Sequence, residues 1–203
     1  WGNASSRYSR SGLHASAAMN VAREKLATYL RVKPERVIFT SGATEANNLA
    51  LLGHARAKAL ELGQPGHLIT VSTEHHSVIA PLRQLQREGF RLTEINPEHD
   101  GLLSSQKLID AFESDTLLVS VMMANNEIGV LQPLEEVSKL CSERGVVFHS
   151  DAAQAFGQLN FDLDDIGIDF LSISGHKIYG PKGVGALIIR PNLPILPLQW
   201  GGG

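Results

Sequence analysis

Segments that favour strands alternate with segments that favour helices along most of this chain. They follow one another at least five times, with connections of only a few residues. Predicted strands cover 36–40, 67–72, 91–95, 116–123, 146–150 and 169–174, and predicted helices cover about 77–88, 104–112 and 133–144, together with one that the run 41–48 opens and that ends near residue 62. This pattern is typical of an α/β domain, and it predicts a three-layer α/β/α fold around a mainly parallel mixed sheet.

The amino-terminal segment has a different pattern. Residues 1–16 are rich in Ser, Gly, Asn and Arg and show no period, so they are predicted to form a loop. From Ala17 the pattern becomes helical, with Val21, Leu26 and Leu30 on one predicted face.

The composition excludes several classes of protein. With 203 residues, 43% hydrophobic and 19% charged, the chain suits one globular domain and not a disordered segment. A net charge of −3 gives no electrostatic argument for binding nucleic acid or an anionic membrane. A single cysteine excludes an intrachain disulfide and fits a reducing compartment. We find no apolar run near the roughly 20 residues of a membrane span, and no signal peptide.

A glycine-rich turn near the carboxyl end contains two lysines, Lys177 and Lys182. The apolar run 170–173 leads into it, and a second apolar run, 184–189, follows. The turn is therefore either an ordinary hairpin with exposed lysines or the site of an amine that binds a carbonyl group. Both interpretations are open on this stretch alone.

Polar residues gather where five predicted strands end. The clusters are Ser41–Thr44, Thr73–His76, Asn125–Glu127, Asp151–Gln154 and Ser174–Lys177. Each has a plain interpretation as a helix cap, a turn or a buried histidine. Because ligands of parallel sheets bind beyond the carboxyl ends of the strands, five such clusters together predict one shared site.

The clusters together suit one cofactor. Hydroxyl and amide groups at a helix amino terminus bind phosphate. A carboxylate keeps a pyridine nitrogen protonated, an imidazole stacks on the ring, and a lysine forms a Schiff base. This combination predicts a site for pyridoxal 5′-phosphate.

Other motifs fail on spacing. The run 180–183 lacks the pattern of a nucleotide P-loop, and 183–185 has Ile188 where a dinucleotide fingerprint needs its third glycine. No serine lies in a G-x-S-x-G elbow. No helical pairing supports a metal site, so none is predicted from the candidate ligands His75, His76, His149 and Asp151.

The single cysteine, Cys141, is predicted to be structural. It lies at helical spacing from Leu134 and Val137, which places it on the face toward the core.

Five motifs, in chain order, resemble those of cysteine desulfurases of the NifS/IscS type, which are class V, fold-type I pyridoxal-phosphate enzymes. They are S-G-A-T-E at 41–45, T-E-H at 73–75, N-N-E-I-G at 125–129, D-A-A-Q at 151–154 and S-G-H-K-I-Y-G-P-K-G at 174–183. The opening G-N-A-S-S at 2–6 is similar to the family's G-N-P-S-S, with Ala4 in place of proline.

The resemblance implies roles for individual residues. Lys177 carries the Schiff base, Asp151 pairs with the pyridinium nitrogen, and His75 stacks on the ring and assists proton transfers. Lys182 is left as structural or solvated. The remaining cofactor contacts are made to the phenolic oxygen by Gln154 and Asn126, and to the phosphate by Thr44, Ser174, His176 and the Ala43–Thr44 backbone.

The implied reaction removes sulfur from L-cysteine. Lys177 moves the α-proton, a cysteine thiolate of the enzyme attacks the substrate sulfur, and alanine leaves. The persulfide passes to an iron–sulfur scaffold or another sulfur-acceptor protein, or serves tRNA thiolation. A homodimer is expected, since the family takes one phosphate contact from the neighbouring subunit. A cytoplasmic location is expected as well.

The resemblance also implies that residues 1–203 are an incomplete large domain. The family's attacking cysteine, its carboxylate-binding arginine, its small domain and its opening strand are expected outside this stretch. Two alternatives stay open: another class V activity, such as a selenocysteine lyase or an aminotransferase, and a truncated domain that binds the cofactor without turnover.

Overall fold

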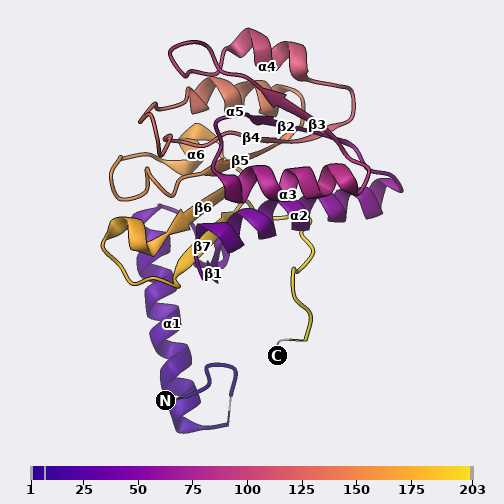
Figure 1. The fold of residues 1–203 in the computed structure, drawn as a ribbon. Helices are drawn as coiled ribbons and strands as arrows, with labels where there is room; N and C mark the ends of the chain where they lie inside the picture. Colours follow the sequence, from indigo (N-terminus) through magenta and orange to yellow (C-terminus); the bar gives the residue numbers. More distant parts are fainter. Residues whose placement is uncertain (1, 7, 202–203) are drawn as a thin grey trace.

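The computed structural model describes residues 2–6 and 8–201, which form one sheet with helices on both faces (Figure 1). The strands are β1 (Val37–Thr40), β2 (His67–Val71), β3 (Arg91–Ile95), β4 (Thr116–Ser120), β5 (Val147–Asp151), β6 (Phe170–Ser174) and β7 (Gly185–Ile189). The α-helices are α1 (Arg10–Tyr29), α2 (Ala43–Leu62), α3 (His76–Arg87), α4 (Ser105–Ala111), α5 (Leu134–Glu143) and α6 (Leu163–Ile166). Short 3₁₀ turns are η1 (Pro34–Arg36) and η2 (Gly175–Ile178).

The seven strands lie in the order β1-β7-β6-β5-β4-β2-β3. Only β7 is antiparallel to its neighbours, β1 and β6, while every other pair is parallel. The predicted fold class is therefore confirmed. Because all strands except β7 point the same way, their carboxyl ends meet at one edge of the sheet.

Alternating side chains of each strand enter two separate cores. On β6, Phe170 packs in the core beneath α2 and α3, whereas Leu171 packs in the core beneath α4, α5 and α6. The same alternation separates Val147 from Phe148 on β5. Strands buried on both faces read as continuous apolar runs, which is why the sequence predicted them so clearly.

The first helix differs from its prediction. Helix α1 begins at Arg10 and not near residue 17, because the side chain of Ser9 caps it by accepting a hydrogen bond from the amide of Gly12. The predicted face is also wrong in part: Leu30 is buried, but Val21 is 50% exposed. Figure 1 shows the reason, since α1 projects away from the sheet and only its carboxyl end reaches the body.

The glycine-rich turn is a hairpin, as one interpretation of the sequence allowed, and the role of its lysines stays a prediction. Strands β6 and β7 pair antiparallel, as in a hairpin, with Ser174 opposite Gly185. The connection contains η2, which begins immediately after β6 and holds Lys177 at the carboxyl edge.

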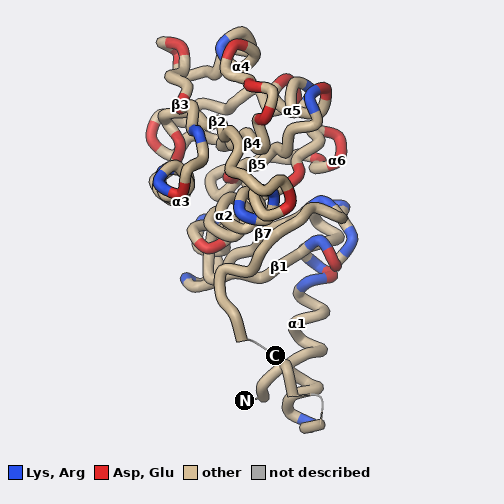
Figure 2. Tube along the Cα trace, turned by 90° about the vertical axis from the view of Figure 1, so that its right-hand side faces the viewer, with Lys and Arg blue, Asp and Glu red and all other residues tan. Residues whose placement is uncertain are grey.

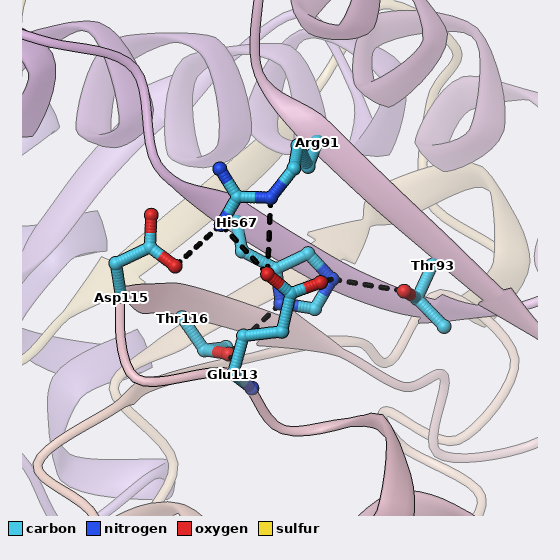
Figure 3. A network of polar contacts seen from close by, with 6 residues as sticks. All are labelled: His67, Arg91, Thr93, Glu113, Asp115 and Thr116. Carbon is cyan, nitrogen blue, oxygen red and sulfur yellow. Dashed lines mark hydrogen bonds and ion pairs between the residues drawn. The ribbon is translucent and has the colours of Figure 1, made fainter.

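A polar network lies at the opposite, amino edge of the sheet (Figure 3). His67, the first residue of β2, contacts the hydroxyls of Thr93 and Thr116, each at 2.9 Å, and lies near Glu113. Arg91, the first residue of β3, pairs with Glu113. Burial lowers the pKa of His67, although Glu113 opposes the effect. The network joins the beginnings of three strands, far from their carboxyl ends, so we interpret it as structural.

A second buried histidine crosses the middle of the sheet. Nδ1 of His149, on β5, lies 2.8 Å from the Ser120 hydroxyl on β4, and its Nε2 lies 3.1 Å from the Ser172 hydroxyl on β6. Burial lowers the pKa of His149 from 6.5 to about 3. The imidazole is therefore a neutral crosslink between three strands.

Acid should weaken the fold through His149. Below pH 6.5 the unfolded chain takes up a proton at this ring while the folded chain does not, down to about pH 3. The free energy of unfolding then falls by up to about 1.4 kcal/mol per pH unit from this group. Urea unfolding at about pH 7 and pH 5 should show the wild type losing roughly 2 kcal/mol more than His149→Gln. Equal losses in the two proteins would contradict the prediction.

Charged residues of both signs are interspersed over the body, as Figure 2 shows. Within the described residues, every helix is too short or too polar to cross a membrane.

Candidate functional site

A cavity of about 460 Å³ opens at the carboxyl edge of the sheet. All nine residues predicted to bind or act on a cofactor line it: Ala43, Thr44, His75, Asn126, Asp151, Gln154, Ser174, His176 and Lys177. They come from five separate strand ends and line one cavity, as the parallel sheet led us to expect, whereas cofactor binding and their individual roles stay predictions. The wall also includes Ser41, Gly42, Ser77, Met122, Ala124, Ala153, Lys182 and Gly183.

One wall of the cavity is the amino terminus of α2. Its N-cap is Gly42, and among the described residues no side chain caps the helix by a hydrogen bond. First-turn amides left in this way, together with the helix dipole, attract an anion. Gly42 also lies against β6, since a Cβ placed on it would be 3.9 Å from the Ser174 hydroxyl. That hydroxyl lies 2.7 Å from Nδ1 of His176. The arrangement is chemically suited to an anion the size of phosphate.

The carboxylate of Asp151 lies at the end of β5, and the residue is only 4% exposed. Its Oδ2 accepts a hydrogen bond of 2.7 Å from Nδ2 of Asn47, and its Oδ1 accepts one of 2.9 Å from the amide of Ala153. These two bonds fix the orientation of the carboxylate at the cavity wall. A fixed, buried carboxylate is suited to pairing with a cationic ring nitrogen.

The two adjacent asparagines have different tasks. Asn125 is buried; its Nδ2 donates to the carbonyl of Thr73, and its Oδ1 accepts from the amides of Glu127 and Ile128. Asn125 therefore shapes the loop, which leaves the exposed Asn126 at the cavity. The family resemblance had singled out Asn126, and the structure gives a physical reason for the difference.

Both lysines of the glycine-rich turn line the cavity. The prediction that Lys182 is solvated agrees with its exposure, but its position brings a second amine to the same wall. Lys177 is anchored better, because the next residue, Ile178, packs against the core and closely against Gly157.

Glu74 is a buried acid that the sequence reasoning did not single out. Its Oε1 accepts a hydrogen bond from the amide of Met122, a residue that lines the cavity. Burial, and to a lesser degree the charge of Asp151, raises the pKa of Glu74 well above its ordinary value. Glu74 lies between Thr73 and His75 in one of the predicted polar clusters, and this position was the available signal for a role at the site.

Asn47 and Ser77 were also missed. Asn47 is fully buried in α2 between Ala46 and Ala50, and Ser77 is buried in α3. A polar side chain on an otherwise apolar helix face, one turn from a binding-site helix terminus, was the available signal.

The interpretation of Cys141 as structural is confirmed. The residue is 1% exposed in the core beneath α5, and burial raises the pKa of its thiol to about 12. It is not among the residues that line the cavity. Across residues 2–6 and 8–201, no group of three or more His, Cys, Asp or Glu side chains is arranged to hold a metal ion.

Comparison with known proteins assigns the chain to a family. The aminotransferase class-V family matches residues 1–203. Human cysteine desulfurase is 48% identical over 205 residues, covering 100% of this chain and 44% of that protein. The cysteine desulfurase IscS of Photobacterium profundum is 46% identical, covering 100% of this chain and 50% of that protein. The chain thus spans about half the length of the curated relatives it matches.

Solved structures agree. A structure described as SspA in complex with cysteine superposes with a TM-score of 0.94 at 42% identity, covering 100% of this chain and 58% of that one. A NifS-like protein superposes with a TM-score of 0.92 at 37% identity, covering 100% and 55%. The resemblance to NifS/IscS-type cysteine desulfurases is therefore confirmed. The chain belongs to the aminotransferase class-V family.

Proposed function

We propose that this chain forms the cofactor-binding part of a pyridoxal-phosphate-dependent cysteine desulfurase. The observation that supports the proposal most directly is the convergence of nine predicted residues on one cavity. Their chemistry fits the cofactor group by group: an uncapped helix amino terminus for the phosphate, a fixed carboxylate for the pyridine nitrogen, and an amine for the aldehyde.

Each group of the cofactor has a candidate partner. The amino terminus of α2, with Thr44, Ser174 and His176, holds the phosphate. Asp151 keeps the ring nitrogen protonated, His75 covers the ring, and the phenolic oxygen is contacted from the side of the cavity lined by Gln154 and Asn126. When bound, pyridoxal phosphate supplies an electron sink for the charge that develops at the substrate Cα.

The substrate that we propose is L-cysteine. In this reaction Lys177 takes the proton from the substrate Cα and later returns it. Asp151, at the ring nitrogen, and the α2 terminus, at the phosphate, keep the cofactor in position. The bound cysteine named for the SspA structure, at 42% identity, supports this choice. An iron–sulfur scaffold or another sulfur-acceptor protein is the proposed partner, and the site is proposed to work in a homodimer in the cytoplasm.

The thiolate that accepts the sulfur must come from elsewhere than the cysteine of this chain. Cys141 is the only one, and its thiol is buried with a pKa of about 12. A neutral, enclosed thiol is neither nucleophilic nor accessible.

The 203-residue chain should therefore bind pyridoxal phosphate but show no sustained release of alanine or sulfide. The test mixes the loaded chain with L-cysteine and a reductant and follows both products over time. A change in the absorption of the bound cofactor on adding L-cysteine, but not on adding L-serine, supports the proposal. Failure to bind pyridoxal phosphate would overturn it, and steady turnover would overturn the exclusion of Cys141.

A further inference from the structure

Helix α3 has an unusual N-cap. The residue at this position is His75, whose Nδ1 accepts a hydrogen bond of 3.1 Å from the amide of Ser77. Ser, Thr, Asp and Asn usually supply this acceptor. A histidine can do so only through an unprotonated ring nitrogen, because a protonated one has no lone pair. The cap therefore identifies Nδ1 as an acceptor, and in the neutral ring the proton must be on Nε2.

A chain of hydrogen bonds continues from this histidine to Asp151. The hydroxyl of Ser77 lies 2.7 Å from Nδ1 of His75 and 2.9 Å from Nδ2 of Asn47. The same Nδ2 lies 2.7 Å from Oδ2 of Asp151. The chain thus links residues of α2, α3 and β5 that meet at the cavity.

The direction of every bond in this chain is determined. An amide NH₂ has two protons and accepts nothing, so Asn47 gives one proton to Asp151 and the other to Ser77. Because the cap leaves Nδ1 without a proton, the Ser77 hydroxyl is the donor in its contact with this nitrogen, whose one lone pair is shared by the amide and the hydroxyl of Ser77. Turning the Asn47 amide over would place its oxygen against a carboxylate. The observed orientation leaves Oδ1 of Asn47 buried without a partner among the described residues, a cost that a purely structural site would avoid.

We propose that Asn47 and Ser77 are positioning residues that hold Asp151 and His75 as one unit and keep neutral His75 in the form with its proton on Nε2. Nδ1 is occupied by the cap and the hydroxyl, so Nε2–H is the polar group that His75 offers to a molecule in the cavity. The tautomer follows from this chain alone, and only its use with pyridoxal phosphate rests on the proposed function.

The consequence is a division of labour between two residues. A neutral His75 with Nε2–H can donate a hydrogen bond through that nitrogen, but Nε2 cannot take up a proton because it has no free lone pair. The amine of Lys177 is then the group that takes the proton from the substrate Cα. The choice of base therefore depends on Asn47 and Ser77, which hold His75 in this form.

The tautomer can be measured without cofactor. Long-range ¹H–¹⁵N spectra of the histidine-labelled 203-residue chain, at about pH 8.5 where an unperturbed imidazole is neutral, distinguish the two nitrogens. The chain has eight histidines, and His75→Asn, which keeps a capping acceptor, identifies the signals of His75. We expect the Nε2–H form in the wild type. Ser77→Ala should raise the population of the Nδ1–H form about fivefold, the ratio set by one typical hydrogen bond.

Controls separate this inference from the proposed function. Ser142→Ala, an exposed serine of α5, should leave the His75 signals unchanged. Asn47→Ala should weaken pyridoxal phosphate binding about tenfold, because Asp151 loses a hydrogen bond to its charged form. A wild-type His75 mainly in the Nδ1–H form, or unchanged populations in Ser77→Ala, would overturn the inference. A chain that binds no cofactor yet shows the Nε2–H form would contradict only the proposed function.

Discussion

Replacing Lys177 by alanine should abolish the covalent adduct that borohydride fixes between this chain and pyridoxal phosphate. A primary amine condenses with the cofactor's aldehyde with loss of water, and hydride makes the bond permanent. Two amines line the cavity, Lys177 and Lys182. Lys177 lies in η2, directly after β6, and Ile178 anchors the turn in the core. The anchored amine is the one expected to react, with complete loss of the fixed adduct in Lys177→Ala.

Lys182→Ala is the matched control for this prediction. It removes an amine from the same wall of the same cavity, so it tests position and not only chemistry. Mass spectrometry of the reduced, digested chain should find the adduct on Lys177 in the wild type and in Lys182→Ala. An adduct on Lys182, or an undiminished adduct in Lys177→Ala, would show that the assignment is wrong.

The layers of the fold were predictable because they follow from periodicity. Strand β6 is buried at every position and carries apolar side chains toward both faces, and α5 carries Leu134, Val137 and Cys141 at helical spacing. The order of strands was not predictable. Strand β7, last in the chain, lies between β1 and β6. The turn after β6 allowed a hairpin between β6 and β7, but nothing local to the strands encodes the pairing of β7 with β1. Strand order is decided by the packing of whole layers.

Helix α1 shows where periodicity fails. Ser9 is a capping residue in the sequence, but Gly12 follows it in the first turn and lowers the expected helix propensity. Because most of α1 projects from the body, no continuous apolar face is required of it, so Val21 is exposed. A pattern that reports burial cannot locate the end of a helix that is not buried.

The site was predicted at the level of strand ends and missed at the level of contacts. Nine lining residues lie in clusters that directly follow strands, so the parallel sheet brings them together. The bonds of Asn47 to Ser77 and Asp151 span 30 and 104 residues. Such contacts depend on how α2 and α3 lie over the sheet, which no local motif specifies.

Gly185→Ala should destabilise the fold and weaken cofactor binding together. A Cβ at this position would lie 2.6 Å from Cα of Gly42 and 2.6 Å from the carbonyl oxygen of Ile173. Both are backbone atoms, so no side chain can turn away to make room. Gly185 pairs with Thr40 on one side and with Ser174 on the other. Its strand, β7, therefore lies directly against the turn that connects β1 to α2. We expect a loss of about 3 kcal/mol in the free energy of unfolding.

The same substitution should displace the proposed phosphate seat, because the clash pushes Gly42, the N-cap of α2, away from β7. The control is Gly63→Ala at the far end of α2, where φ is +74° and no atom lies within 4 Å of the added Cβ. It should cost about 1 kcal/mol of backbone strain and leave cofactor affinity unchanged. Urea unfolding and cofactor titration of both variants measure the difference. A Gly185→Ala protein no less stable than Gly63→Ala, with unchanged affinity, would show that the contact between β7 and this turn does not hold the α2 terminus in place.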